Sequence, residues 1–285
     1  MRDYTFVTFP GHGIGDIICA HYIFEGIREV LKGDFVFFSQ KPKWSKLFFN
    51  NVRDFEDIEN YQDDSIISIN MSGDKPGFTR AQSWSIPVSQ KLNFKIKPKR
   101  PEVFFDNFKP ALDYEYIVLA PFCSGVGSNR NWPIQYYEIL ERNINKLGIR
   151  TIILEGRNSE DRTKRGNFKS QVFFQLEPKK VCNIVKNSIL VVGNDSGIVH
   201  IAGVLEKEAI AIHSIYDKKM LWGEYTSITS VCPSKNMTCR FCYMDRKKGY
   251  MANCWQNCAL QSTIPVTSVF REVKKILNKF SISRL

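Results

Sequence analysis

The chain has 285 residues, of which 40 are Lys or Arg and 29 are Asp or Glu, so its formal charge is +11. This length exceeds one ordinary domain of about 100–200 residues and predicts two. A hydrophobic fraction of 43% excludes a globally disordered chain. No segment approaches the roughly 18 uninterrupted apolar residues of a transmembrane helix, which argues against an integral membrane protein.

The compartment is predicted from the N-terminus and from the cysteines. The chain does not begin with the basic region, apolar stretch and small-residue cleavage site of a secretory leader. Five of its eight cysteines lie within residues 232–258, which favours a local metal site in a reducing compartment over a disulfide scaffold. We therefore expect a cytoplasmic protein.

The positive charge is unevenly distributed along the chain. Residues 1–110 carry 15 basic and 14 acidic side chains, whereas residues 111–285 carry 25 and 15, which leaves +1 and +10 on the two parts. A basic surface attracts phosphate groups in a nucleotide, a nucleic acid or an anionic membrane. Charge of this kind also serves solubility, and by itself it does not separate these roles.

The first part of the chain reads as an α/β unit. Apolar residues recur at helical spacing over 16–27, directly after a glycine-rich turn. From about residue 71 to 115 this periodicity fades and prolines punctuate the stretch, which predicts the end of the first domain and a linker. Strands are expected at 4–9, 35–38 and 65–69.

A second α/β series follows the linker. Short apolar strands that alternate with helices predict parallel sheets buried on both faces. We expect two Rossmann-like domains that face each other across a cleft, covering residues 1–110 and 111–265, and a C-terminal helix within 266–285. The second domain includes the cysteine-rich segment 232–258. Its strands are expected at 116–120, 150–154, 172–174, 188–192 and 209–212, the last of them closing the sheet, and its helices at 133–147, 178–186 and 198–205.

The first strand-to-helix junction carries an acidic residue. The turn 11–15 begins like a dinucleotide fingerprint, but Asp16 follows Gly15 where the third glycine would be expected, and no P-loop sequence occurs. The turn instead delivers Asp16 to the carboxyl end of a parallel strand. There a carboxylate acts as a general base or caps the helix, and both roles are open.

Two junctions in the second part favour phosphate binding. The small, polar loop 193–197 opens a helix, whose free N–H groups and positive dipole end attract phosphate. His200 lies about one turn into this helix, where it contacts a diphosphate or has only a structural role. In the loop 121–133, Arg130 is able to neutralise phosphate charge, and Trp132-Pro133 would fix the helix start.

Together the three junctions resemble glycosyltransferase family 9, the ADP-heptose:lipopolysaccharide heptosyltransferases, which have the GT-B fold. The third motif is the most specific of the three. The matching residues are Gly15-Asp16, Pro121-Phe122-Cys123-Ser124 with Arg130-Asn131-Trp132-Pro133, and Asp195-Ser196-Gly197-Ile198-Val199-His200-Ile201-Ala202.

The resemblance implies an inverting glycosyltransferase that uses a nucleotide-diphosphate sugar. It implies that Asp16 is the catalytic base and that Glu160 contacts the donor ribose. Arg130 stands where the family has a lysine, which keeps the charge and changes its shape. The donor-binding residues implied in this way are Ser124, Arg130, Glu160, Asp195, Ser196, Gly197, Ile198 and His200.

Three interpretations of the partner follow. By resemblance, the acceptor is a surface glycan such as lipopolysaccharide core, handled by a peripheral protein at the inner face of the membrane. A phage-type enzyme in the host cytoplasm would instead modify hydroxymethylated bases of DNA, and a third interpretation is a non-catalytic nucleotide- or glycan-binding protein. DNA is favoured by a basic and aromatic stretch that also reads as a solvated linker, formed by Lys91, Lys95, Lys97, Lys99 and Arg100 with Phe94, Phe104 and Phe105.

The cysteine cluster is a separate signal. Cys239-x-x-Cys242 and Cys254-x-x-x-Cys258 supply two pairs of thiolates whose spacing suits a tetrahedral zinc or iron site. Four thiolates without an open position predict a structural metal. Similar cysteine-rich segments precede the terminal helix in many members of the resembled family, and some of these bind iron.

Overall fold

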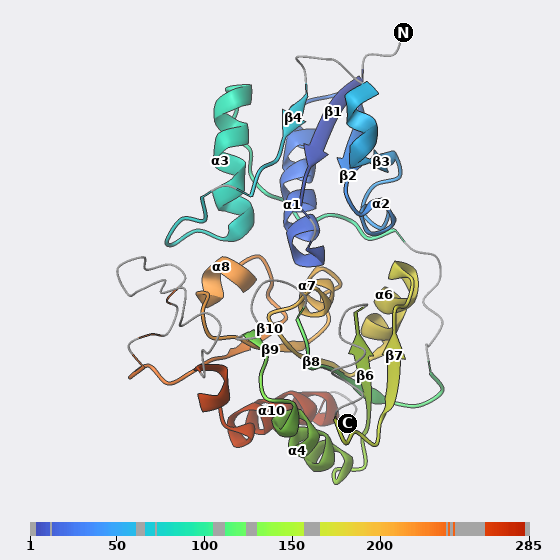
Figure 1. The fold of residues 1–285 in the computed structure, drawn as a ribbon, viewed down its shortest axis with the longest axis vertical. Helices are drawn as coiled ribbons and strands as arrows, with labels where there is room; N and C mark the ends of the chain where they lie inside the picture. Colours follow the sequence, from blue (N-terminus) through green and yellow to red (C-terminus); the bar gives the residue numbers. More distant parts are fainter. Residues whose placement is uncertain are drawn as a thin grey trace. The chain divides into compact units, whose positions relative to one another are not determined.

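The chain forms two compact units, Met1–Asn107 and Phe108–Leu285, and each is built on its own parallel sheet (Figure 1). This arrangement comes from a computed structural model. The structure describes residues 4–11, 13–60, 66–71, 73–104, 112–123, 130–156, 166–237, 239, 242 and 260–282.

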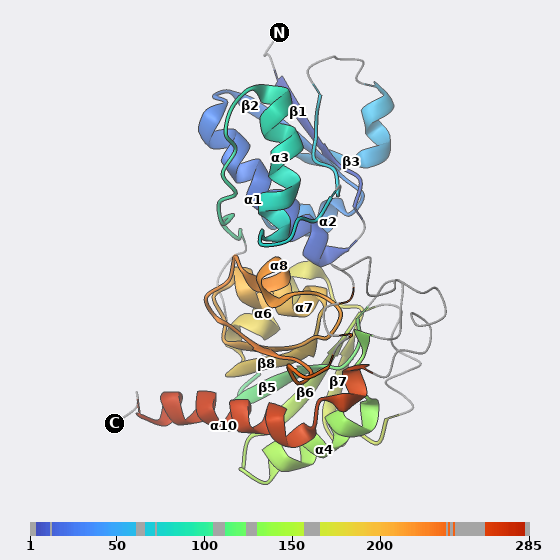
Figure 2. The same cartoon turned by 90° about the vertical axis from the view of Figure 1, so that its left-hand side faces the viewer.

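The first unit has a four-stranded sheet in the order β3-β2-β1-β4, with every pair parallel. Helices α1 and α3 lie side by side against it (Figures 1 and 2). The strands are β1 (Tyr4–Phe9), β2 (Asp34–Ser39), β3 (Val52–Asp54) and β4 (Ile67–Ser68). The helices are α1 (Ile14–Val30), α2 (Pro42–Ser45), the 3₁₀ helix η1 (Phe55–Asn60) and α3 (Arg80–Leu92).

Helix α3 corrects the expectation of a linker between residues 71 and 115. Its buried face carries Trp84 and Val88 together with three small residues, two of them serines, so the apolar period is weak. Pro87 lies within the helix and also reads as a break. A local signal was nevertheless present, because Thr79 and Gln82 form a capping box at the start of the helix.

A histidine is buried in the core of this unit. His21 is fully buried on α1, and its ring centroid lies 4.5 Å from that of Phe37 and 5.0 Å from that of Phe48. Neither ring nitrogen has a hydrogen-bond partner within the described residues. Burial lowers the pKa of His21 from 6.5 to about 3, so the side chain is neutral in the folded protein at ordinary pH.

We predict that His21 makes the protein sensitive to acid. Between pH 6.5 and 3 the unfolded chain binds a proton here that the folded chain does not, so stability falls as the pH drops through this range. Each pH unit costs on the order of 1 kcal/mol. Urea unfolding of wild type and His21→Leu at pH 7.5, 6 and 5 would show a shallower loss in the variant. Parallel losses in both proteins would contradict the prediction.

The second unit has a six-stranded parallel sheet in the order β10-β9-β8-β5-β6-β7. Its strands are β5 (Tyr116–Ala120), β6 (Arg150–Glu155), β7 (Gln171–Phe174), β8 (Leu190–Asn194), β9 (Ala209–Ile212) and β10 (Ile228–Val231). Its helices are α4 (Ile134–Asn145), α6 (Pro178–Asn187), α7 (Gly197–Val204), α8 (Lys218–Trp222), the 3₁₀ helix η5 (Leu260–Thr263) and α10 (Val266–Ile282).

Helices cover both faces of this sheet. Helices α4 and α10 lie together on one face, and α6, α7 and α8 lie on the other (Figure 2). The core joins Leu119 and Ile153 of the strands to Leu140 of α4 and Val273 of α10. No helix among the described residues is both long and apolar enough to cross a membrane.

The sheet does not close at β9, which corrects a second expectation. Strand β10 pairs in parallel with β9, and Ile228 lies opposite Ala209. Its sequence Ile-Thr-Ser-Val is short and half polar, and three of its four residues are only partly buried. An edge strand of this composition gives a weak sequence signal.

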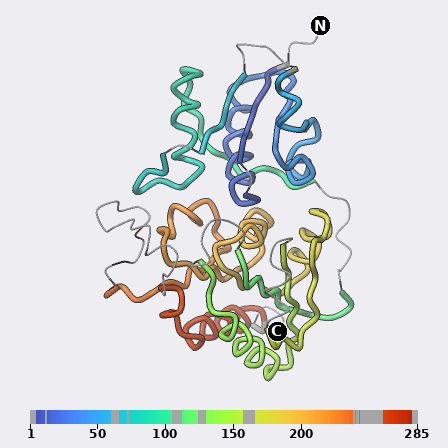
Figure 3. The backbone as a smooth tube through the Cα atoms, viewed as in Figure 1, coloured from blue at the N-terminus to red at the C-terminus, as the bar shows by residue number. Residues whose placement is uncertain are grey.

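In each sheet the first strand is an internal one at which the strand order reverses. Strand β1 lies between β2 and β4, and β5 lies between β6 and β8. Figure 3 shows the backbone of both units as a tube in the view of Figure 1. Open α/β sheets bind ligands beyond the carboxyl ends of their strands at such reversal points. Asp16 after β1 and Asp195 after β8 lie beyond such strand ends, and a role of either residue in ligand binding stays a prediction.

Candidate functional site

Asp16 lies in the first turn of α1, directly beyond the carboxyl end of β1. Its Oδ1 atom accepts a hydrogen bond of 3.2 Å from Nη1 of Arg80, at the start of α3. Its side chain is 28% exposed and therefore reachable from solvent. The Oδ2 atom lies above Gly13, where a Cβ on residue 13 would come within 2.4 Å of it. The helix dipole also favours the carboxylate at this end of α1.

Arg80 is held in place by its own neighbours. Its Nε atom lies 3.7 Å from Oδ2 of Asp74, and its guanidinium lies 5.6 Å from the ring centre of Trp84. The Trp84 indole donates a 3.0 Å hydrogen bond to Oδ1 of Asp74 and stacks on Phe9, the last residue of β1. Sequence reasoning did not find Arg80, which lies 64 residues from Asp16 in the stretch interpreted as a linker.

On the second unit, a buried amide joins the ends of β5 and β8. Asn194 is fully buried, and its Oδ1 accepts hydrogen bonds from the Trp132 amide and the Tyr137 hydroxyl, both at 3.1 Å. Its Nδ2 donates to the Pro121 carbonyl at 2.5 Å. Burial raises the pKa of Tyr137 well above its ordinary value, so its hydroxyl keeps the proton that it donates. Asn194 thus fixes both ends of the loop that contains Ser124 and Arg130.

We predict that Asn194→Ala destabilises the protein by about 3 kcal/mol, because the Trp132 amide and the Pro121 carbonyl lose a buried partner at about 1–3 kcal/mol each, while the Tyr137 hydroxyl keeps a 3.5 Å bond to the Ala120 carbonyl. If the loop after β5 binds phosphate as the sequence predicts, the variant should also bind phosphate more weakly, since Asn194 no longer fixes the ends of the loop. Asn183→Ala is the matched control, because the side chain of Asn183 is half-buried and its Oδ1 accepts a hydrogen bond from Asn187 within the same helix, α6. Chemical unfolding of both variants measures the difference, and equal losses would contradict the prediction.

The start of α7 has the features of an anion site. Ser196 is the N-cap residue, yet its hydroxyl does not cap the helix; it is buried and has no hydrogen-bond partner within the described residues. The amides of Val199 and His200 bond to the Ser196 carbonyl. The amides of Gly197 and Ile198 precede them, where an α-helix has no internal acceptor to offer. Two amides and one hydroxyl are therefore available for an anion.

Arg130 and Asp195 form an ion pair beside this helix start. Nη1 of Arg130 lies 3.1 Å from Oδ2 of Asp195, and the two side chains are 17% and 6% exposed. Burial opposes the charge of Arg130, but Asp195, Cys123 and Tyr216 together outweigh this effect, so the pKa of Arg130 is raised above its ordinary value. Asp195 therefore orients and partly neutralises Arg130. A donor contact of either residue stays a prediction.

His200 is buried away from solvent in a cluster of aromatic rings. Its Nδ1 lies 2.9 Å from the Tyr225 hydroxyl, and its ring centre lies 4.7 Å from that of Trp222. Tyr225 packs on α7 where Gly203 has no side chain, since a Cβ there would lie 2.6 Å from the ring. These contacts give His200 a structural role, and its contact with a donor stays a prediction.

The cysteine segment leaves and rejoins the sheet at one strand end. At its start, the Val231 carbonyl accepts a 3.1 Å hydrogen bond from the His213 amide. At its end, Gln261 in η5 donates 3.0 Å to the Ile212 carbonyl. Both anchors are consecutive residues at the end of β9.

Only part of the predicted metal site is described. Cys239 is exposed and Cys242 is partly buried, and neither forms a disulfide within the described residues. No group of three or more His, Cys, Asp or Glu side chains able to hold a metal ion occurs within the described residues. The remaining predicted residues that lie outside the described part of the chain are Ser124, Glu160, Cys254, Cys258 and Phe105.

The basic and aromatic stretch is packed on the first unit. The Lys99 amide donates 2.8 Å to the Tyr22 carbonyl of α1, and the Lys99 side chain pairs with Glu29. Phe94 and Phe104 are 53% and 41% exposed. The backbone is therefore fixed while both aromatic rings face solvent, and a contact of this stretch with DNA stays a prediction.

Solved structures with a similar fold are heptosyltransferases and a related transferase. The Escherichia coli ADP-heptose lipopolysaccharide heptosyltransferase II has a TM-score of 0.72 at 10% identity, with 97% of this chain and 99% of that chain covered. A family 9 glycosyltransferase from Veillonella parvula has a TM-score of 0.72 at 12% identity, with 97% of each chain covered. TibC from enterotoxigenic E. coli is described as a dodecameric iron-containing heptosyltransferase and was solved with ADP-D-β-D-heptose. It has a TM-score of 0.74 at 13% identity, with 98% of this chain and 77% of that chain covered. At such identities the likeness concerns the fold alone.

These architectures define the fold class: parallel α/β sheets like those of the GT-B heptosyltransferases. The profile of the family described as glycosyltransferase family 9 (heptosyltransferase) matches residues 78–250, which is more than half of the chain. The chain therefore belongs to glycosyltransferase family 9. No curated protein matches the sequence.

Proposed function

We propose that this glycosyltransferase transfers a sugar from a nucleotide-diphosphate donor to an acceptor hydroxyl with inversion at the anomeric carbon, and that Asp16 is the general base. The observation that carries the proposal is the position of Asp16, a partly exposed carboxylate beyond the carboxyl end of β1 at the reversal point of its sheet. That is where α/β sheets hold their ligands, and it is the position of the acidic residue in the resembled motif.

The proposed step is a direct displacement. The acceptor oxygen forms a bond to the anomeric carbon and passes its proton to Asp16, while the bond from that carbon to the diphosphate breaks and its electron pair leaves with the diphosphate. The second unit stabilises the departing charge through the amides of Gly197 and Ile198, the Ser196 hydroxyl and Arg130. Because Asp195 already neutralises part of Arg130, we assign the larger share to the start of α7.

We propose ADP-heptose as the first donor to test, because structures of similar fold are described as ADP-heptose heptosyltransferases. For the acceptor we propose a surface glycan such as lipopolysaccharide core. The protein would act in the cytoplasm, with peripheral contact to the inner face of the membrane, where anionic lipids attract a chain of charge +11.

We predict that Asp16→Asn lowers transfer by about 10²–10⁴-fold, the usual contribution of a general base, while donor binding is retained. Transfer is measured as ADP release from ADP-heptose in the presence of lipopolysaccharide that lacks heptose. Binding is measured as the rise of Tm with ADP-heptose, since a ligand of the folded state stabilises it by mass action.

Asp34→Asn is the matched control for this experiment. It removes the same charge from the same unit, at the amino end of β2, where the side chain is exposed. Full activity of Asp16→Asn would overturn the role of Asp16. A duplex with hydroxymethylated bases is tested in parallel, and transfer to it alone would replace the glycan by DNA as acceptor.

We further propose that Cys239, Cys242, Cys254 and Cys258 hold a structural zinc or iron ion, which the spacing of the two cysteine pairs supports. Metal analysis of protein purified without chelator should find about one ion per chain in wild type and much less in Cys242→Ser. Cys232→Ser is the matched control and should keep its metal. Absence of metal from wild type would count against the site.

A further inference from the structure

We propose that Arg80 is a positioning residue for Asp16. We propose also that Gly13 is needed for the same position, because it has no side chain to occupy the space of the Asp16 carboxylate. This inference rests on the proposed function, in which Asp16 accepts the acceptor's proton. Arg80 holds one carboxylate oxygen, and Gly13 leaves room for the other, so that the two together select one rotamer of Asp16.

The contact to the first oxygen is directional. Nη1 of Arg80 lies 3.2 Å from Oδ1 of Asp16, and the Arg80 side chain is only 13% exposed. A guanidinium this close and this shielded favours the ionised carboxylate, which is the form that accepts a proton. Arg80 thus acts on the reaction through Asp16.

The second oxygen of Asp16 has room only because residue 13 is glycine and carries no side chain. Gly13 has φ −76° and ψ 137°, a conformation that alanine adopts equally well. A Cβ at this position would nevertheless lie 2.4 Å from Oδ2 and 3.2 Å from Cγ of Asp16. Alanine would therefore displace the carboxylate without straining the backbone.

Arg80 is itself too constrained to serve as a loose surface cation. Asp74 lies 3.7 Å from its Nε, and Trp84 holds Asp74 by a 3.0 Å hydrogen bond while its ring lies beneath the guanidinium. Trp84 also stacks on Phe9 of β1. Strand β1, which precedes Asp16, is therefore connected to the Asp16 carboxylate through Trp84, Asp74 and Arg80 in turn.

The test compares Arg80→Met, Arg80→Lys and Gly13→Ala in the full chain. We expect Arg80→Met and Gly13→Ala to lower kcat by about 10²-fold, the usual cost of a misplaced catalytic group, with donor binding unchanged. In Arg80→Met the acidic limb of the pH profile of kcat/KM should move to higher pH, because the cation that favours the carboxylate is gone. Arg80→Lys keeps the charge, so we expect the acidic limb of its kcat/KM profile to lie at the pH of wild type.

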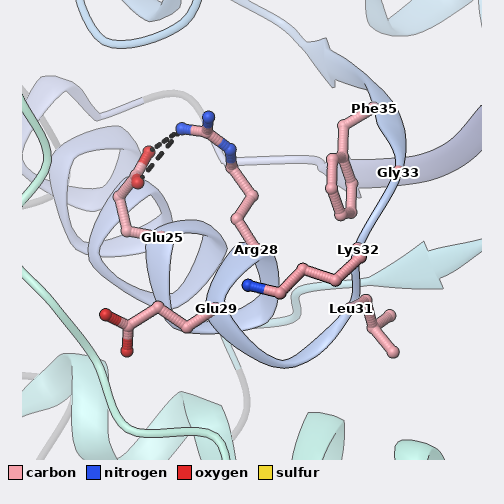
Figure 4. A pocket seen from close by; sticks show the side chains of 7 residues that line it. All are labelled: Glu25, Arg28, Glu29, Leu31, Lys32, Gly33 and Phe35. Atoms are coloured by element: carbon pink, nitrogen blue, oxygen red, sulfur yellow. Dashed lines mark hydrogen bonds and ion pairs between the residues drawn. The ribbon is translucent and has the colours of Figure 1, made fainter.

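Arg28→Met is the matched control. Arg28 lies on the same helix about 18 Å from Asp16 by the helical rise. It pairs with Glu25 at 2.8 Å, and its guanidinium lies 5.3 Å from the ring centre of Phe49, so it has the same two kinds of contact as Arg80. Figure 4 shows this pair beside an open hollow of about 290 Å³ near the end of α1. Its loss should leave both kcat and the pH profile unchanged.

The outcomes separate this inference from the proposed function. Full activity of Asp16→Asn would remove both. An inactive Asp16→Asn together with a wild-type kcat and pH profile in Arg80→Met would overturn the inference alone. A change confined to the KM of the acceptor would also overturn it, since Arg80 would then bind acceptor directly.

A crystal structure of Arg80→Met gives a readout that needs no substrate. We expect the Asp16 carboxylate to leave its position above Gly13. An unchanged rotamer would overturn the inference. If Arg80→Met does not fold, Asp74→Asn replaces it, because the asparagine oxygen still accepts from Trp84 while the charge that orients Arg80 is lost.

Discussion

Parallel strand pairing is the constraint on which the rest of this structure depends. Every strand pair described in both sheets is parallel, so within each unit all carboxyl ends lie along one edge. In the second unit, the register that places Ala120 opposite Gly193 brings the loops after β5 and β8 together. Asn194 completes that contact with a single buried amide. The site is thus a consequence of strand direction before any particular side chain contributes.

In each of the two units, the charge of the candidate residues is balanced locally. Asp16 is paired with Arg80 inside the first unit, and Arg130 with Asp195 inside the second. The +10 charge of residues 111–285 is therefore not concentrated at Arg130, whose charge is partly compensated by Asp195. Attraction for a diphosphate at this place depends on the dipole and amides of α7, and the remaining basic side chains act as a diffuse field.

The sequence predicted the features that depend on neighbouring residues. Short-range patterns predicted strands β1 and β5 and their neighbours, the glycine turn before Asp16 and the start of α7. The family resemblance that these segments carry is confirmed. Features of weak local pattern were missed. The buried face of helix α3 includes serines, which weaken its apolar pattern, and β10 is a short, half-polar edge strand.

Contacts between distant segments gave no sequence signal at all. Arg80 lies 64 residues from Asp16, and the pair depends on how α3 packs beside α1. The ion pair of Arg130 with Asp195 has a separation of 65 residues and is equally hidden. Charged residues in a loop are visible in a sequence, but which of them neutralise one another is decided by tertiary packing.

The anchoring of the cysteine segment bears on its conformational entropy. Val231 and Gln261 are bound to the consecutive residues His213 and Ile212, so the fold has already closed the loop that carries the cysteines. Most of the entropy lost in bringing distant parts of a chain together is therefore spent during folding of the sheet. An isolated zinc finger needs its metal to fold, because there the metal alone closes the chain. In this protein a cross-link between the cysteines would therefore add comparatively little to the global free energy of unfolding.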